Sequence, residues 1–319
     1  MKLNDRDYRN AVEVMSKLLW GNQEDRSKLQ DIGINIIPVN FYSNIPSISE
    51  TLNSFEYFEE FPYLDSKIFD QNLLREEINS LQLFGNTWAP DEFGDPETCT
   101  RYFESNGQFG NTDARSYYAY LKRLKPKKVV EIGSGFSSLI ALQALRENGS
   151  GQLICIDPFP RPFIKQLAES GDLELLQQRV QDVTIMSIDA LLEDGDFLFI
   201  DSTHTVKTGS DCLHIYLRLI PQITSNIIVH VHDIFLPDGM PQRWITDLQI
   251  YWTEQYLLLA LLIDNPRTRV LFASHYNTLV NSDLLANCLP ATPTGVLGGG
   301  SFWFSYNGGQ NSGQLTFDE

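Results

Sequence analysis

The stretch that most constrains the fold is VVEIGSGFSSLIALQAL, residues 129–145. It begins as a short apolar strand, passes through two glycines, and continues with apolar residues at helical spacing. Short apolar segments then alternate with helical segments as far as residue 306. This alternation predicts a mostly parallel sheet covered by helices on both faces. We therefore predict an α/β fold with a doubly wound sheet of seven strands.

The chain divides into three regions by this rhythm. Residues 1–110 lack it and predict a mainly helical cap with irregular segments, because proline-rich and aromatic stretches separate two helical patterns. Residues 111–306 carry the alternation and form the predicted core domain, opened by a helix for which Thr112 or Asp113 is the expected N-cap. The polar, glycine-rich segment 307–319 predicts a flexible tail.

Composition restricts the partners. The formal net charge of −17 argues against binding to nucleic acid, because a phosphate backbone attracts a basic surface. It also disfavours docking on an anionic membrane, and the longest apolar run, residues 256–263, is far shorter than the roughly 20 residues that span a bilayer. The N-terminus lacks the apolar core of a signal peptide, and the four cysteines show no paired spacing. We therefore expect a cytoplasmic protein with reduced thiols.

The glycine turn raises the question of a ligand. Gly133 and Gly135 allow close approach of the backbone, and the following helix N-terminus offers free N–H groups to an anion. Asp157, at the end of the next strand, has the spacing of an acid that binds ribose hydroxyls. A dinucleotide site expects a third glycine, where this chain has the segment 136–138, Phe-Ser-Ser. A tight turn without ligand, and an N-cap role for Asp157, remain open alternatives.

Four motifs occur in order at successive strand ends: VVEIGSGFSS, ICIDPFP, DFLFIDSTHTVKTGSDC and IIVHVHDIFLP. Together they resemble class I S-adenosylmethionine-dependent methyltransferases, and more narrowly a bacterial small-molecule subgroup with Asp-x-x-His after strand four and His-Asp after strand five. The resemblance covers roughly residues 111–306. It implies a Rossmann-like sheet whose last strand, GGSFWF, runs antiparallel to the others.

The resemblance also implies a cofactor, S-adenosylmethionine, and roles for individual residues. The methionine part would lie along residues of the glycine turn, and the adenosine part along residues that follow the second and third strands. The implied cofactor-binding set is Glu131, Gly133, Ser134, Gly135, Asp157, Phe159, Gln181, Asp182 and Asp201. Asp189 competes with Asp182 for the adenine position.

A second group of polar residues follows strands four and five. Asp201 and His204 lie in DSTH, and His232 and Asp233 lie in HVHD, so both pairs fall on the ligand side of the predicted sheet. A histidine of neutral pKa could remove a proton from the acceptor during methyl transfer. Alternatively, Asp201 and Asp233 could hold Mg²⁺, although a histidine would be an unusual ligand for it. We favour the metal-free base, with His232 ahead of His204.

The predicted function is methyl transfer from S-adenosylmethionine to a small or medium-sized acceptor, at oxygen, in secondary metabolism. Acceptor specificity is expected in segments 41–100 and 236–244, with Tyr102, Phe103 or Phe109 closing over the substrate. Two other functions remain: a nicotinamide-dependent oxidoreductase, and a non-enzymatic cofactor-binding partner in a biosynthetic pathway. The sequence identifies neither the acceptor nor the oligomeric state.

Overall fold

The computed structural model describes residues 4–291 and 296–310. Seven strands form one sheet in the order β3-β2-β1-β4-β5-β7-β6, and β7 runs antiparallel to both of its neighbours. The strands are β1 Lys128–Ile132, β2 Gln152–Ile156, β3 Glu174–Leu176, β4 Phe197–Ile200, β5 Asn226–Val231, β6 Thr268–Ala273 and β7 Phe302–Asn307. The predicted seven-stranded α/β sheet with an antiparallel last strand is therefore confirmed.

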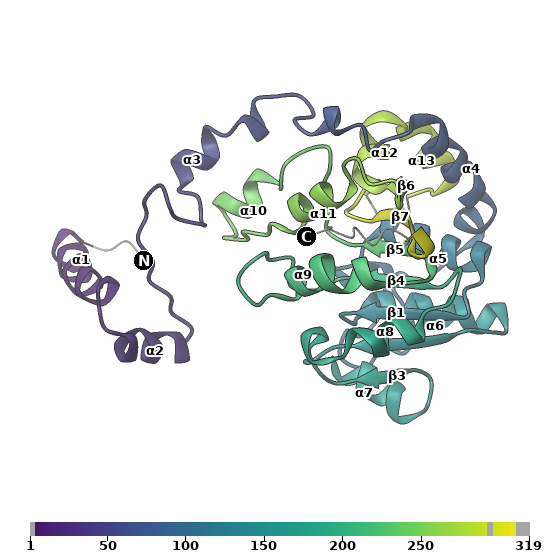
Figure 1. The fold of residues 1–319 in the computed structure, drawn as a ribbon, viewed down its shortest axis with the longest axis horizontal. Coiled ribbons are helices and arrows are strands. Elements are labelled where there is room, and N and C mark those ends of the chain that lie inside the picture. The colour runs from purple at the N-terminus through teal and green to yellow at the C-terminus, as the bar shows by residue number, and fades with distance from the viewer. Residues whose placement is uncertain (1–3, 292–295, 311–319) are drawn as a thin grey trace, which may run out of the picture.

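Thirteen α-helices surround or precede this sheet in the described part of the chain (Figure 1). They are α1 Asp5–Leu19, α2 Gln23–Asp31, α3 Ile48–Leu52, α4 Gln71–Thr87, α5 Asn111–Leu124, α6 Phe136–Asn148, α7 Pro162–Glu169, α8 Ile185–Leu191, α9 Asp211–His214, α10 Gln242–Thr246, α11 Glu254–Leu262, α12 Ser274–Val280 and α13 Ser282–Cys288. Single turns of 3-10 helix occupy Phe55–Tyr57, Leu64–Ser66, Glu104–Asn106, Val180–Asp182, Ile220–Gln222 and Gly308–Gln310, and a π-helical turn occupies Ile215–Leu219.

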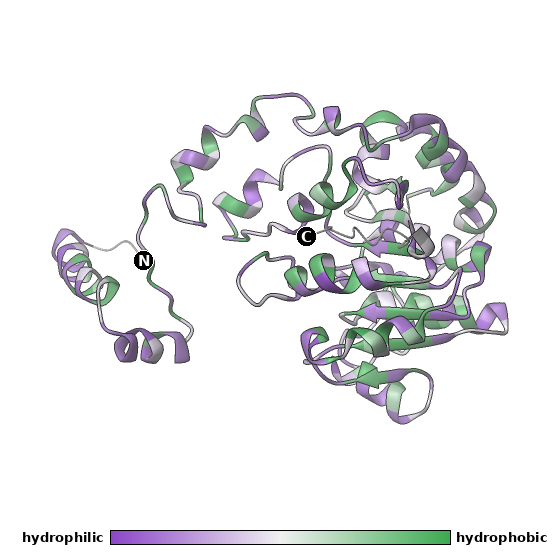
Figure 2. Ribbon diagram, in the orientation of Figure 1, coloured by the Kyte–Doolittle hydropathy of each residue, from purple (hydrophilic) through white to green (hydrophobic). Residues whose placement is uncertain are grey.

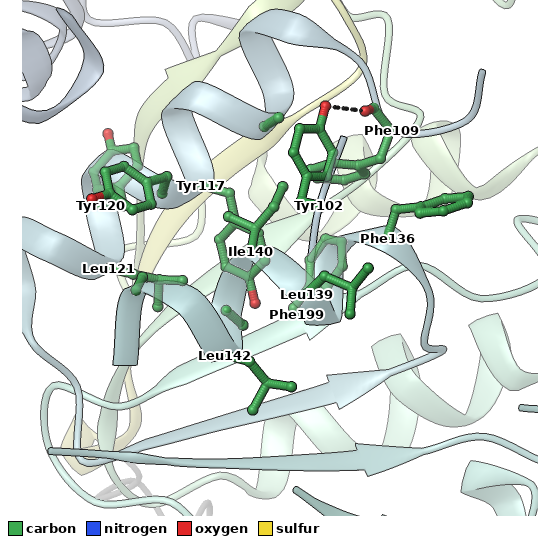
Figure 3. Packing of buried hydrophobic residues seen from close by; sticks show 14 of the residues in the cluster. Tyr102, Phe109, Tyr117, Tyr120, Leu121, Phe136, Leu139, Ile140, Leu142 and Phe199 are labelled. Atoms are coloured by element: carbon green, nitrogen blue, oxygen red, sulfur yellow. Dashed lines mark hydrogen bonds between the residues drawn. The ribbon is translucent and has the colours of Figure 1, made fainter. Parts of the chain in front are cut away.

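Side chains alternate between the two faces of the sheet and so build two cores. Val129 of β1 packs into a core under α5, α6 and α7, whereas its neighbour Val130 packs into a core under α8 and α11. Aromatic rings dominate the first core: Phe199 of β4 lies against Tyr117 of α5, and Phe136 opens α6 (Figure 3). Burial on both faces explains why the strands read as continuous apolar runs.

The predicted N-cap of α5 is wrong. The helix begins at Asn111 after Gly110, so Thr112 and Asp113 lie in its first turn. Both side chains are engaged by a distant segment instead: Thr112 accepts a hydrogen bond from the N–H of Gly298, and Asp113 accepts one from that of Gly300. Tertiary contacts have overridden the local capping preference.

Only part of the region 1–110 packs against the rest of the structure. Helix α4 packs against α5 and α13, and its residues Leu74, Ile78 and Leu81 are fully buried. By contrast, α1 and α2 contain no buried residue and lie apart from the body (Figure 1). The division at residue 110 stays a prediction, and positions 311–319 of the predicted tail lie outside the described residues.

Candidate active site

The glycine turn after β1 is fixed against the end of β4. Gly133 has φ +91°, and a Cβ atom there would lie 1.9 Å from the backbone oxygen of Asp201. The N–H of Asp201 in turn donates to the carbonyl of Ile132, which continues the parallel ladder beyond the strand. Gly133 is therefore required by packing as well as by backbone conformation. A Cβ at Gly135 would meet nothing within 4 Å.

A cavity of about 490 Å³ lies at the carboxyl ends of β1, β2 and β4, where the sheet order reverses. Gly133, Ser134, Asp157, Phe159, Gln181 and Asp201, all predicted as cofactor-binding, line it. The Asp157 carboxylate accepts hydrogen bonds from Ser134 Oγ at 2.6 Å and from the Phe159 N–H at 2.7 Å. Because a carboxylate has about four acceptor positions, Asp157 keeps capacity for a ligand.

Three predicted cofactor residues, Gly135, Asp182 and Glu131, lie outside this lining. Asp182 forms an ion pair with Arg179, 2.8 Å away, on the exterior. Glu131 is fully buried beneath the turn, where its carboxylate accepts hydrogen bonds from Tyr117 Oη at 3.0 Å, from Ser138 Oγ and from Cys155 Sγ. Burial raises the pKa of Glu131 to about 7, against the opposing effect of these donors. The cofactor roles of all nine predicted residues stay predictions.

The four predicted catalytic side chains do converge. His204 Nε2 lies 3.2 Å from Asp201 Oδ1 and 3.6 Å from Asp233 Oδ2. His232 Nδ1 lies 3.6 Å and 3.5 Å from the same two carboxylate oxygens. His204 and Asp233 are also two non-glycine residues with left-handed backbone, at φ 55° and 57°. Such conformations are sparsely populated and cluster at functional sites.

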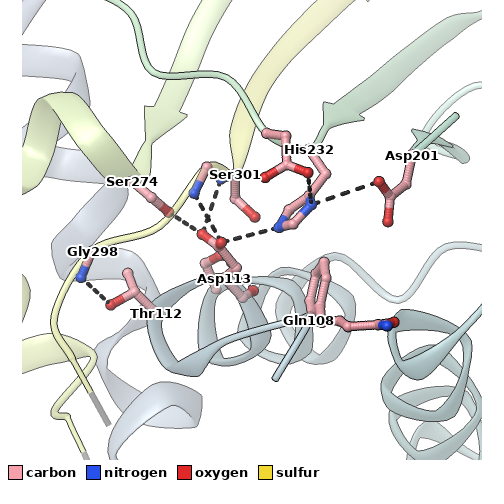
Figure 4. A network of polar contacts seen from close by, with 12 residues as sticks. Gln108, Thr112, Asp113, Asp201, His232, Ser274, Gly298 and Ser301 are labelled. Atoms are coloured by element: carbon pink, nitrogen blue, oxygen red, sulfur yellow. Dashed lines mark hydrogen bonds and ion pairs between the residues drawn. The ribbon is translucent and has the colours of Figure 1, made fainter. Parts of the chain in front are cut away.

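Each of these histidines is held from behind by a buried carboxylate that the sequence did not identify. His204 Nδ1 lies 2.7 Å from Glu254 Oε2. His232 Nε2 lies 3.1 Å from Asp113 Oδ2 (Figure 4). We refer to these contacts as the two carboxylate–histidine pairs. Each pair fixes the ring and directs its other nitrogen toward Asp201 and Asp233.

Asp113 is the most densely bonded member. Its carboxylate also accepts hydrogen bonds from Ser274 Oγ at 2.6 Å and from the N–H groups of Gly300 and Ser301, each at 2.9 Å (Figure 4). A Cβ at Gly299 would lie 2.2 Å from this carboxylate. The run of three glycines before β7 thus lets the backbone wrap closely around Asp113.

The carboxylates set the charge of the cluster. Burial opposes protonation of His204, but hydrogen bonds to Asp201 and Glu254 outweigh it and raise its pKa to about 10. For His232, burial is likewise outweighed, chiefly by the charges of Asp233 and Asp201, and its pKa lies well above the usual value. The pKa of Asp201 is lowered in spite of burial, by the two histidines. Without a ligand, both imidazoles are therefore held protonated at neutral pH.

His230 takes no part in this cluster. It is buried, its Nε2 lies 2.8 Å from Ser301 Oγ, and its ring stacks on Trp303 at a centroid distance of 3.8 Å. Burial places its pKa well below the usual value. His230 is thus a neutral core histidine.

A second cavity, of about 380 Å³, lies on the other side of the cluster. Its lining includes His232 and Asp233, with Gln108, Phe235 and Trp244 from three separate segments. Trp244 belongs to the predicted specificity segment 236–244, whereas no lining residue falls in segment 41–100. Tyr102, Phe103 and Phe109 are buried in the first core (Figure 3), and the Phe109 ring lies 4.7 Å from that of His232.

The cluster could also hold a metal ion. One ligand atom each from Asp201, His204 and Asp233 lies within 4.8 Å of the others, the one such group among the residues that the structure describes. Metal-binding histidines commonly bond a carboxylate through their second nitrogen, as His204 does with Glu254. Imidazole suits transition metals, whereas Mg²⁺ favours oxygen ligands, so the histidines weigh against magnesium.

Asp113 and Glu254 were missed for a physical reason. Asp113 was expected to be a helix N-cap, and no sequence motif singled out Glu254. Neither lies at a strand end, and His232 and Asp113 are 119 positions apart. No local spacing connects such residues.

The sequence is similar to a known family and to a known protein. A family model described as "Methyltransferase domain" matches residues 130–234. An uncharacterized protein of Archaeoglobus fulgidus is 32% identical over 192 residues, which cover 57% of this chain and 84% of that protein. Within the described residues, no helix has the length and apolarity needed to cross a membrane.

Solved structures are similar at lower identity. A putative O-methyltransferase from Klebsiella pneumoniae is 14% identical, with a TM-score of 0.38, and the match covers 76% of this chain and 93% of that one. An O-methyltransferase from Bacillus cereus, in complex with SAH, is 15% identical with a TM-score of 0.37, over 76% and 94% of the two chains. No residue role follows from likenesses of this level. The family model identifies a methyltransferase domain at residues 130–234, at the centre of the confirmed sheet, in agreement with the predicted class I S-adenosylmethionine-dependent methyltransferase.

Proposed function

We propose that this protein transfers a methyl group from S-adenosylmethionine to an oxygen atom of a small acceptor. The observation that carries the proposal is the position of the histidine–carboxylate cluster. Asp201 lines the first cavity, His232 and Asp233 line the second, and Asp201 lies 3.6 Å from the His232 ring. A donor in the first cavity and an acceptor in the second would meet at this cluster.

The residues of the first cavity fit the cofactor. Its volume lies in the range of about 300–1,000 Å³ that is typical of small-molecule sites. Asp157 would accept the ribose hydroxyls, and the exposed ring of Phe159 would lie beside the adenine. Gly133 and Ser134 would border the methionine part. When bound, S-adenosylmethionine supplies an electrophilic methyl group on a positively charged sulfur.

His232 would act as the base. Asp113 holds its Nε2, so Nδ1 faces the junction of the two cavities and could accept the acceptor's hydroxyl proton. Because the pKa of His232 is raised, the neutral imidazole that a base requires is the minor form. A positive charge beside Asp201 would lower the pKa of His232 and favour the neutral form.

A metal-assisted variant of the same reaction is favoured by the grouping of Asp201, His204 and Asp233. A divalent cation there would lower the pKa of an acceptor hydroxyl directly. The two mechanisms differ in their response to chelators: EDTA leaves the rate unchanged with a histidine base and abolishes it with a metal.

Cofactor binding is tested by calorimetry with S-adenosylhomocysteine. Asp157→Ala should weaken binding by about 10- to 150-fold, the equivalent of about 1.5–3 kcal/mol for charge-assisted hydrogen bonds. Asp172→Ala is the matched control, because its carboxylate is paired with Arg146 and neither residue lines the cavity. Wild-type affinity in the Asp157 variant would contradict the site, and tight binding of NAD instead would favour the oxidoreductase.

Turnover is tested with radiolabelled S-adenosylmethionine and a panel of phenols and alcohols. His232→Ala should reduce transfer by roughly 10²–10⁴-fold with cofactor affinity retained. Near-normal transfer by this variant would remove His232 from the mechanism. Cofactor binding without transfer to any acceptor would favour the non-enzymatic alternative.

A further inference from the structure

The N-terminal arm, residues 4–43, is an apolar surface that its own chain leaves uncovered. Its helices α1 and α2 have no buried residue, and the arm lies away from the body with green, apolar stretches among its polar ones (Figures 1 and 2). Tyr8, Trp20, Phe41 and Tyr42 are 63%, 76%, 82% and 84% exposed. A monomeric protein rarely exposes so much contiguous apolar surface.

Helix α1 has an apolar face that is suited to binding another surface. Tyr8, Val12, Met15 and Leu19 follow the i, i+4, i+7, i+11 spacing that places them on one face of the helix. Asn10 lies on the opposite face. An isolated helix of this length is marginal in water, so its stability calls for a partner on the apolar face.

The body carries a matching apolar groove. A cavity of about 500 Å³ runs between the turn 215–219 and α11, and its walls are mostly apolar: Tyr216, Leu217, Pro221, Leu257, Ala260, Leu261 and Ile263. Leu217 is 59% exposed there. The chain therefore presents both an uncovered apolar helix and an uncovered apolar groove.

We infer that the arm of one copy docks on the body of a second copy, with the apolar face of α1 seated in this groove. An exchange of arms about a two-fold axis covers both surfaces on both copies at once.

The area and charge fit a dimer. Aromatic side chains bury about 150–250 Å² each when fully covered. The four rings of the arm are 63–84% exposed, so covering their exposed parts would remove about 450–750 Å² per copy from water. That approaches the ~800 Å² per partner of a standard interface before the aliphatic side chains are added. The arm has six acidic and five basic residues in a chain of net charge −17, so it approaches another acidic body with little repulsion. It also lacks the basic excess that attracts an anionic membrane.

The test is the mass of the full chain by size-exclusion chromatography with light scattering. The wild type should have twice the 36.3 kDa mass of one chain. The double variant Val12→Glu, Met15→Glu should be a monomer, and it cannot unfold the body because α1 contributes no buried residue. Leu217→Glu should also be a monomer.

Two controls place the same charge elsewhere. Asn10→Glu lies on the polar face of α1 and Leu83→Glu on an exposed position of α4, so both should remain dimers. A monomeric wild type, or a Leu217→Glu variant that stays dimeric, would overturn the inference. Co-sedimentation of the wild type with phosphatidylglycerol vesicles would overturn it in favour of a membrane.

Discussion

Glu131 offers a direct test of how the core beneath the glycine turn is held. Its carboxylate is fully buried, and its partners Tyr117, Ser138 and Cys155 all donate to it. Glu131→Gln removes the titrating group while keeping its size. In the variant, the amide nitrogen replaces one acceptor oxygen, and the hydroxyls of Tyr117 and Ser138 can turn to accept from it.

The magnitude follows from the pKa in the two states. Burial raises the pKa of Glu131 from 4.5 to about 7 in the folded protein. A raised pKa means that the folded state binds the proton more tightly, so the stabilisation is complete below pH 4.5 and is lost as pH rises through about 7. The shift corresponds to about 3 kcal/mol, of which about 2–3 kcal/mol should be lost between pH 5 and pH 8.

The measurement is the free energy of unfolding in urea at pH 5, 6, 7 and 8. The wild-type value minus the Glu131→Gln value should fall by about 2–3 kcal/mol across this range. Tyr117→Phe removes one donor to the ionised form, so it should move the fall to higher pH. A difference that stays constant with pH would refute the argument, because Glu131 would then titrate alike in both states.

Two further changes test other parts of the site. Asp113→Asn removes the charge behind His232, and we expect a loss of about 2–4 kcal/mol in unfolding free energy together with a 10²–10⁴-fold fall in transfer rate. Wild-type activity with unchanged stability would show that the Asp113–His232 pair contributes to neither. Gly133→Ala should destabilise the fold by more than 2 kcal/mol, because the added Cβ would meet the backbone of Asp201. Gly171 also has a positive φ, +79°, but open space around it, so Gly171→Ala should cost only about 1–2 kcal/mol of conformational strain. Equal losses in urea unfolding would mean that contact with Asp201 is not what requires glycine at position 133.

The sheet could be predicted because its signal is local and repeated. The strands have 3–6 residues and are mostly apolar, and each of β1 to β6 is followed by a helix, so the sequence pattern is repeated along the chain. The N-terminal region could not be predicted in the same way. An amphipathic pattern such as that of α1 shows that one face needs cover, but not which surface provides it. Within the region predicted as a cap, α4 packs against the body, whereas the arm with α1 and α2 lies apart from it.

In the candidate site too, some residues could be predicted from the sequence and others could not. Asp201, His204, His232 and Asp233 were brought together by one rule, that the ends of parallel strands meet at one edge of the sheet. Asp113 and Glu254 reach the cluster from helices, through side chains whose direction depends on how those helices pack. Their effect is nevertheless large, because the two pairs decide which ring nitrogen faces the cavities, and Glu254 acts together with Asp201 to raise the pKa of His204 to about 10. Sequence reasoning thus located the candidate reactive groups, whereas the orientation of the two imidazole rings depends on partners that only the packed helices supply.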